Sequence, residues 1–124
     1  MTNEDKNLLL KDICARLPYN IIIHDIRLRY DWCLREIYVS AKNSTSVNFS
    51  YEDVENFQPY LRPMSSMTEK ESQEYYELTY IEEKRYILPS LLVEITDWLN
   101  AHHFDYRGLI ERGLALKAKE GMYD

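Results

Sequence analysis

A short segment near the C-terminal end of the chain concentrates side chains that could do chemistry. Residues 97–110 contain His102 and His103, followed by Asp105 and Arg107. Imidazole and carboxylate groups are common ligands of transition metals, which need three or four converging donors. Adjacent histidines on a helix point about 100° apart, so a residue from elsewhere would have to complete the site. We favour the alternative in which one histidine caps a helix C-terminus and the other packs, and we predict no bound metal.

The two cysteines offer a second candidate chemistry, a nucleophilic thiol. Cys14 and Cys33 stand alone, without a CxxC spacing, and His24 or a C-terminal histidine would have to approach one of them in the fold. Neither cysteine lies in a recognisable catalytic motif, and the chain, which has 3 glycines, contains no glycine-rich phosphate loop. Isolated cysteines of this kind are typical of reduced, partly buried thiols in a cytosolic protein. We therefore predict a cytoplasmic protein that is not an enzyme and binds no cofactor.

One basic and aromatic segment could bind an anion or a nucleotide. Arg27 and Arg29 lie beside Tyr30 and Trp32, and such residues hold anionic ligands by charge and by stacking. Neighbouring residues of a strand point to opposite faces, however, so the arginines would share one face and the aromatic rings the other. Cross-strand pairing of these arginines with Glu36 or Asp31 is the simpler interpretation.

The overall composition is that of one ordinary globular domain. The 124 residues carry a net charge of −6, and 45 % of them are hydrophobic, so the chain can bury a core without disulfides or metals. The negative charge argues against broad nucleic-acid binding, which depends on a basic surface. The polar N-terminus is unlike a secretory signal, and no apolar stretch approaches the ~20 residues of a membrane span. We expect neither a nucleic-acid partner nor membrane association.

Two compositional biases favour contact with another protein. The chain has 11 tyrosines against 3 phenylalanines, and half-buried tyrosines are common in contact surfaces as well as in cores. Residues 68–83 contain six glutamates and a single lysine, Lys70. An acidic helix of this kind can face a basic partner, although most such helices are only solvated.

The first structural element predicted from the sequence is an N-terminal helix. Apolar residues recur at helical spacing over residues 4–17, with Asp12 and Arg16 on the opposite, solvated side. Pro18 disfavours helical geometry at the residue before it and should end the helix there.

An antiparallel meander is predicted to follow this helix. From Tyr19 through Trp32 the apolar residues alternate with polar ones, which indicates a strand. Further strands are expected over 34–41 and 47–51, with a turn at 42–46. The expected sheet has about three antiparallel strands between residues 20 and 52, and it must pack on a helix.

The middle of the chain combines an irregular stretch with a clear helix start. Residues 57–67, with Pro59 and Pro63, are predicted to be irregular. Thr68 and Glu71 then form a capping-box pattern, in which each side chain can accept a hydrogen bond from the other residue's backbone amide. A helix should run from there to about residue 83.

A further helix and a short strand are predicted to complete the fold. Pro89 suits the first turn of a helix, whose apolar stripe comprises Leu92, Ile95, Trp98 and Leu99. We expect Trp98 to be a main core anchor rather than a ligand-binding ring. Residues 114–118 are expected to return as a short strand at the sheet edge.

The turn at residues 103–108 is predicted to be structural first. Asp105 should accept hydrogen bonds from amides one or two residues further on, and Arg107 should pair with Asp105 or with nearby backbone. Gly108 can take a positive φ that other residues resist. Phe104 and Tyr106 should fix the turn by packing against helix or sheet.

Three blocks of sequence resemble a known family. They are Leu9–Tyr19, Pro59–Glu69 and Asp97–Leu116, and they are similar to blocks of small uncharacterised proteins encoded by gut Bacteroidales and by their phages and mobile elements. The resemblance carries no catalytic residue. It implies a phage or mobile-element context, in which small proteins often act by binding host or viral partners.

Taken together, the sequence predicts a single α+β domain spanning residues 1–124 that acts by protein–protein contact. The partner would be a protein, and a homo-oligomer is allowed. The alternative is a ligand-binding module that sequesters a nucleotide or another small anionic signal. The candidate binding residues are Arg27, Arg29, Tyr60, Arg62, His102, His103, Asp105, Tyr106 and Arg107.

Overall fold

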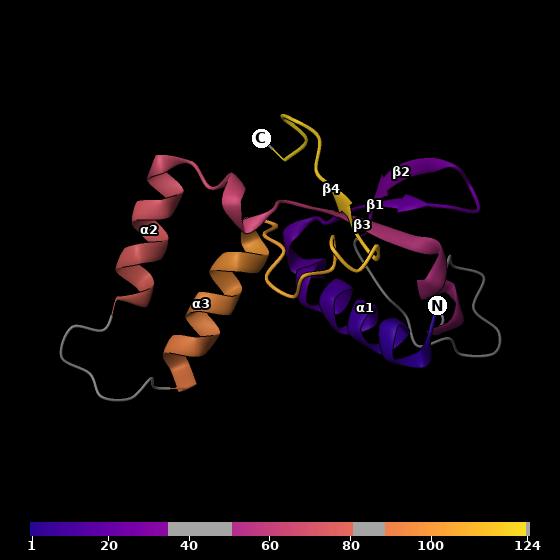
Figure 1. The fold of residues 1–124 in the computed structure, drawn as a ribbon, viewed down its shortest axis with the longest axis horizontal. Helices are drawn as coiled ribbons and strands as arrows, with labels where there is room; N and C mark the ends of the chain where they lie inside the picture. The colour runs from indigo at the N-terminus through magenta and orange to yellow at the C-terminus, as the bar shows by residue number, and fades with distance from the viewer. Residues whose placement is uncertain (35–50, 81–88, 124) are drawn as a thin grey trace.

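The described residues form an α+β fold with an N-terminal helix, a four-stranded sheet and a projecting pair of helices (Figure 1). The computed structural model describes residues 1–34, 51–80 and 89–123. We call α2 and α3 together the arm, and the other described residues the body. In Figure 1 the arm extends to one side of the body, and α1 lies with the sheet on the other side.

The N-terminal helix α1 (Asn3–Arg16) agrees with the prediction. It begins after Thr2, whose hydroxyl accepts a hydrogen bond from the Asp5 amide at 3.0 Å, as an N-cap residue should. The helix ends where Pro18 begins a single 3₁₀ turn, η1 (Leu17–Tyr19). Leu9 and Ile13 on its apolar stripe are completely buried.

The prediction for the polar side of α1 is wrong at two positions. Asp12 and Arg16 were expected on the solvated side, yet both are completely buried and pair with each other at 2.9 Å. Cys14, expected to be partly buried, is exposed, whereas Cys33 is half-buried and both thiols are free. The charged pair can be buried because Arg107, which is distant in sequence, also pairs with Asp12.

The segment expected to form one long strand is instead a hairpin of β1 (Ile22–Asp25) and β2 (Tyr30–Cys33). The Asp25 carboxylate accepts hydrogen bonds from the Arg27 and Leu28 amides at 2.9 and 3.3 Å. The Arg29 amide donates to the Asp25 carbonyl at 2.8 Å, and Arg29 takes a left-handed φ of 58°. An aspartate side chain that accepts hydrogen bonds from the amides of the next few residues stabilises a turn. The alternation of apolar residues therefore continues through a turn rather than along one strand.

The central strand β3 (Phe57–Leu61) lies in the stretch predicted to be irregular. The strand order is β2-β1-β3-β4, with β3 antiparallel to β1 and parallel to the short strand β4 (Leu116–Lys117). Pro59 sits opposite Ile23 in this register, although proline has no amide to donate and is uncommon in such a position. The predicted return of the C-terminal segment to the sheet edge is confirmed.

Part of the predicted meander cannot be compared with the structure. The strand expected at 34–41 lies outside the described residues except for Leu34, as does the turn at 42–46. The strand expected at 47–51 likewise lies outside them except for Tyr51, which begins a 3₁₀ helix, η2 (Tyr51–Asn56). Within the described residues, β3 supplies the third antiparallel strand of the sheet.

The two helices of the arm begin where the sequence predicts. After a 3₁₀ turn, η3 (Met64–Ser66), helix α2 (Glu69–Thr79) starts at Thr68 with the complete capping box. It ends at Thr79, earlier than the predicted residue 83, because the backbone of Tyr80 is extended, with a ψ of 122°. Helix α3 (Pro89–Ala101) begins at the expected proline.

The hydrophobic core lies in the body, between α1, the sheet and the C-terminal turns. Its members are Leu9, Ile13, Ile21, Ile23, Leu34, Val54, Phe57, Leu61, Leu109, Leu114 and Ala115. Neither helix of the arm contributes a residue to this cluster.

Candidate functional site

Arg62 joins the arm to the body. It follows β3 directly, and its two terminal nitrogens donate to the two carboxylate oxygens of Glu71 at 2.7 and 2.6 Å. One of them also donates to the His102 carbonyl at 3.3 Å, and the guanidinium lies 4.3 Å from the centre of the Phe104 ring. The hydrogen bonds from Arg62 lower the pKa of Glu71 to about 2. Such a two-pronged ion pair fixes orientation as well as charge.

A chain of stacked rings forms the seam between α2 and α3. The Trp98 ring stacks on Tyr75 of α2, on His102 and on Phe104, with ring centres 5.6, 4.1 and 5.7 Å apart. The Trp98 indole nitrogen donates to Glu74 at 3.4 Å. Trp98 is half-buried and does not belong to the main core. It anchors this seam, so the prediction that it is a main core anchor is wrong.

The two histidines cap and pack at the end of α3. His102 Nδ1 donates to the Trp98 carbonyl at 2.8 Å. The amides of His103 and Phe104 bind the carbonyls of Asn100 and Leu99, the Schellman pattern that ends many helices. His103 holds the left-handed position, with a φ of 62°, where glycine is usual. Among the described residues, no group of three or more histidines, cysteines or acids could hold a metal ion.

His103 is buried against the C-terminal segment. Its ring stacks on Tyr123 at 3.6 Å between centres, and burial, together with the nearby Arg16 and Arg62 charges, lowers its pKa to about 4. The Tyr123 hydroxyl donates to the Tyr60 carbonyl at 2.7 Å and accepts from the Ile22 amide at 3.1 Å. His103 is therefore neutral at pH 7 and helps to fasten the C-terminal segment to the sheet.

A buried charge network ties α1 to the turn after α3. Asp12 accepts from Arg16 and from Arg107, the latter at 3.2 Å, and Arg16 also donates to the Phe104 carbonyl at 2.6 Å. The Tyr106 ring lies against both guanidiniums, about 5 Å from each. The buried Asp12 carboxylate is thus stabilised by a second positive charge, that of Arg107, which lies 95 residues away in the sequence.

The turn at 103–108 ends α3, as predicted, but its contacts differ from the prediction. Asp105 accepts from the amides of Leu109 and Ile110, at 2.9 and 3.0 Å, four and five residues on rather than one or two. Arg107 pairs with Asp12 and not with Asp105. Gly108 has the expected positive φ, 72°.

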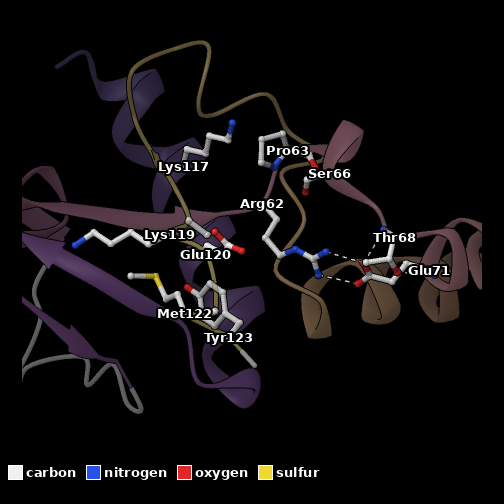
Figure 2. A pocket seen from close by; sticks show the side chains of 12 residues that line it. Arg62, Pro63, Ser66, Thr68, Glu71, Lys117, Lys119, Glu120, Met122 and Tyr123 are labelled. Atoms are coloured by element: carbon white, nitrogen blue, oxygen red, sulfur yellow. Dashed lines mark hydrogen bonds and ion pairs between the residues drawn. The ribbon is translucent and has the colours of Figure 1, made fainter.

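A cavity of about 440 Å³ lies between the start of the arm and the C-terminal segment (Figure 2). Arg62, Lys117 and Lys119 line it, together with Glu71 and Glu120. Figure 2 shows the Arg62 guanidinium turned toward Glu71 and Lys119 turned to the opposite side. Lys119 lies 3.5 Å from Asp31, so two of the three cations already have acidic partners.

Three other candidate residues, Tyr60, Arg27 and Arg29, do not line this cavity. Tyr60 is buried in β3, and its hydroxyl donates to Asp31 at 3.0 Å. Arg27 and Arg29 lie in the β1–β2 turn rather than on one face of a strand, and Arg27 pairs with Asp25. The predicted partner Glu36 falls outside the described residues, and Asp31, the other predicted partner, pairs with His24 and Lys119. The structure thus brings Arg62, His102 and His103 together and leaves the arginines of the turn elsewhere.

The sequence interpretation missed the exposed apolar residues of the arm. Leu92 and Val93 of α3 are 51 % and 58 % exposed. Tyr76 of α2 and Tyr80, which follows this helix, are 55 % and 50 % exposed. One signal was available: Leu91, Leu92 and Val93 are consecutive, and three consecutive positions span too much of a helix surface to share one buried stripe.

Comparisons with protein-family models, with curated proteins and with solved structures found no match. The resemblance to the Bacteroidales and phage family therefore stays a prediction. Within the described residues, no helix combines the length and the apolar character needed to cross a bilayer.

Proposed function

We propose that this chain is a non-catalytic interaction protein that binds a protein partner through the arm. The observation that carries the proposal is the change in exposure along one face of α3. Leu99, at its body end, is 5 % exposed, whereas Leu92, two turns earlier on the same face, is 51 % exposed. The apolar face that the body covers thus continues past the body without a cover among the described residues.

The state of the titratable groups supports a role without catalysis. The strongly shifted groups serve structural contacts: Glu71 is paired with Arg62, and His103 is stacked on Tyr123. A catalytic acid or base is instead expected to converge with other groups on a cleft. The exposed thiol of Cys14 and the free Cys33 fit a reducing compartment, so we also propose the cytoplasm as the location. The family resemblance adds the proposal of a phage or mobile-element context.

The test compares two double variants at exposed positions. Leu92→Ser with Val93→Ser alters the arm, and Lys11→Ser with Glu111→Ser is the control at exposed positions of the body. In capture experiments from a candidate host, quantified by mass spectrometry, we expect the arm variant to retain about tenfold less of a partner that wild type and control both hold. Equal retention by the arm variant would overturn the proposal.

The cavity favours a second function, the binding of a small anion. Lys117 lines the cavity, is exposed and forms no ion pair with another described residue. We rank this function second because Arg62 and Lys119 already bind carboxylates. Isothermal titration with ATP and with inorganic pyrophosphate tests it: saturable binding that Lys117→Ala weakens supports the function, and absence of heat at millimolar ligand excludes it.

A further inference from the structure

The turn between β1 and β2 presents a basic and apolar surface to solvent. All five residues from Ile26 to Tyr30, which we call the hairpin tip, are exposed. Ile26, Leu28 and Tyr30 are 49 %, 54 % and 54 % exposed. Two arginines alternate with these apolar residues. Tips of this kind usually carry polar turn residues, so a run of large apolar side chains at one needs another explanation.

The hairpin tip has a defined conformation. The buried Asp25 carboxylate binds the Arg27 and Leu28 amides and also the Arg27 guanidinium. The exposed Arg29 forms no ion pair with any residue in the described part of the chain. The turn therefore holds Leu28 and Arg29 outward without the entropic cost of ordering a loose loop on binding.

The outer face of α2 has the complementary character. We define this face as Glu69, Gln73, Tyr76 and Glu77, which recur at helical spacing, together with Tyr80, the residue that caps the helix. All five are exposed. The Tyr76 and Tyr80 rings stack with centres 5.0 Å apart, and Gln73 donates to Glu77 at 3.0 Å. Two exposed rings thus lie among exposed carboxylates, the combination that binds an arginine by stacking and by charge.

The two surfaces cannot meet within one molecule. In Figure 1, which is viewed with the longest axis horizontal, α2 and the β1–β2 hairpin lie toward opposite ends. We propose that the hairpin tip of one copy docks on the outer face of α2 of a second copy. A contact of α2 with α2 would instead bring glutamates against glutamates, which is repulsive.

This contact is small, so we expect weak association that depends on ionic strength. A five-residue tip covers far less surface than a stable complex needs. The contact can occur twice in an antiparallel pair or once between successive copies in an open series. Either arrangement uses the same two surfaces, and neither involves Leu92 and Val93, so the inference stands apart from the proposed function.

Sedimentation velocity over a concentration series tests the proposal. The wild type should self-associate at about 0.01 M ionic strength and dissociate at about 1 M, because the screening length falls from about 30 Å to about 3 Å. Arg29→Asp and Glu77→Lys should each weaken association by about tenfold or more. The combined variant, which exchanges the two charges, should regain part of the loss.

Matched variants separate this contact from a general effect of net charge. Lys11→Asp and Glu111→Lys make the same charge changes at exposed positions elsewhere and should leave association unchanged. A wild type that is monomeric at every concentration would overturn the proposal, as would association that Arg29→Asp and Glu77→Lys do not affect. Leu92→Ser with Val93→Ser should keep self-association even if it loses a partner protein.

Discussion

The side chains of the body are far more buried than those of the arm. The body encloses a continuous apolar cluster and even a charged pair, Asp12 and Arg16, without any exposure. Helix α2 has no buried residue, and α3 buries only Leu99 and Asn100. The arm is held by the ring seam at Trp98 and by the Arg62–Glu71 pair at its base. Stability and exposed apolar surface therefore belong to different regions, which allows the arm to present side chains on which the core does not depend.

The largest effect should come from the buried charge in the body. Asp12→Ala removes the acid that neutralises Arg16 and leaves a buried cation unpaired, which should cost about 3–5 kcal/mol in the free energy of unfolding. Lys11→Ala, the exposed neighbour, should change it by no more than about 0.5 kcal/mol. Urea denaturation followed by circular dichroism measures both. A small effect at Asp12 would mean that the network is not buried in solution.

The buried histidine should make stability depend on pH. His103 has a folded pKa of about 4, below its ordinary 6.5, so the unfolded chain binds its proton first. Neutral His103 makes its full contribution to the free energy of unfolding above pH 6.5. This free energy should fall by about 2–3 kcal/mol as the pH falls toward 4. His103→Asn, which tolerates the left-handed backbone, should remove this step from the stability profile. A step of the same size in the variant would assign it to another group.

Removing the Trp98 ring should destabilise the arm without affecting the body. Trp98→Ala should cost about 2 kcal/mol, less than the about 3–5 kcal/mol of a fully buried tryptophan, because Trp98 is half-buried. We expect amide exchange to rise throughout α2 and α3 while α1 keeps its protection. Phe57→Ala in the core is the contrasting variant, and it should lower protection across the body. Loss of protection in α1 on changing Trp98 would contradict the separation of the two regions.

The smallest effect should come from Glu71. Its folded pKa of about 2 lies below the ordinary 4.5, so its stabilisation is present above pH 4.5 and is lost as the pH falls through 2. Since Arg62 is 24 % exposed, we expect only about 1 kcal/mol or less. Glu71→Gln should remove this acid-dependent loss in thermal melts followed by circular dichroism. An unchanged profile would show that the pair contributes little.

The sequence predicts elements whose signals are local and misses those that depend on distant residues. The capping box at Thr68 and the prolines at 18 and 89 act within a few residues, so the helix boundaries that they set agree with the structure, whereas the end of α2, which has no such signal, does not. The hairpin was missed because the alternation of apolar residues is the same through its turn. The burial of Asp12 depends on Arg107, which only the folded chain brings near.

The candidate site was predictable to a similar extent. A capping role for a histidine followed from its place at a helix end. The ion pair of Arg62 with Glu71 and the stacking of His103 on Tyr123 join segments that are distant or irregular in sequence, so no spacing indicated them. The consecutive apolar residues 91–93 indicate that some of them are exposed, but which of them depends on where the body ends along α3.

Native-state amide exchange, followed residue by residue in increasing denaturant, tests the separation of body and arm most directly. The account predicts that α2 and the outer half of α3 open with a lower free energy than α1, β1 and β3, whose opening should approach global unfolding. If α2 and α3 instead exchange with the same free energy as α1 and the central strands, the arm is an integral part of the core. The account of the arm as a separately held surface would then be contradicted.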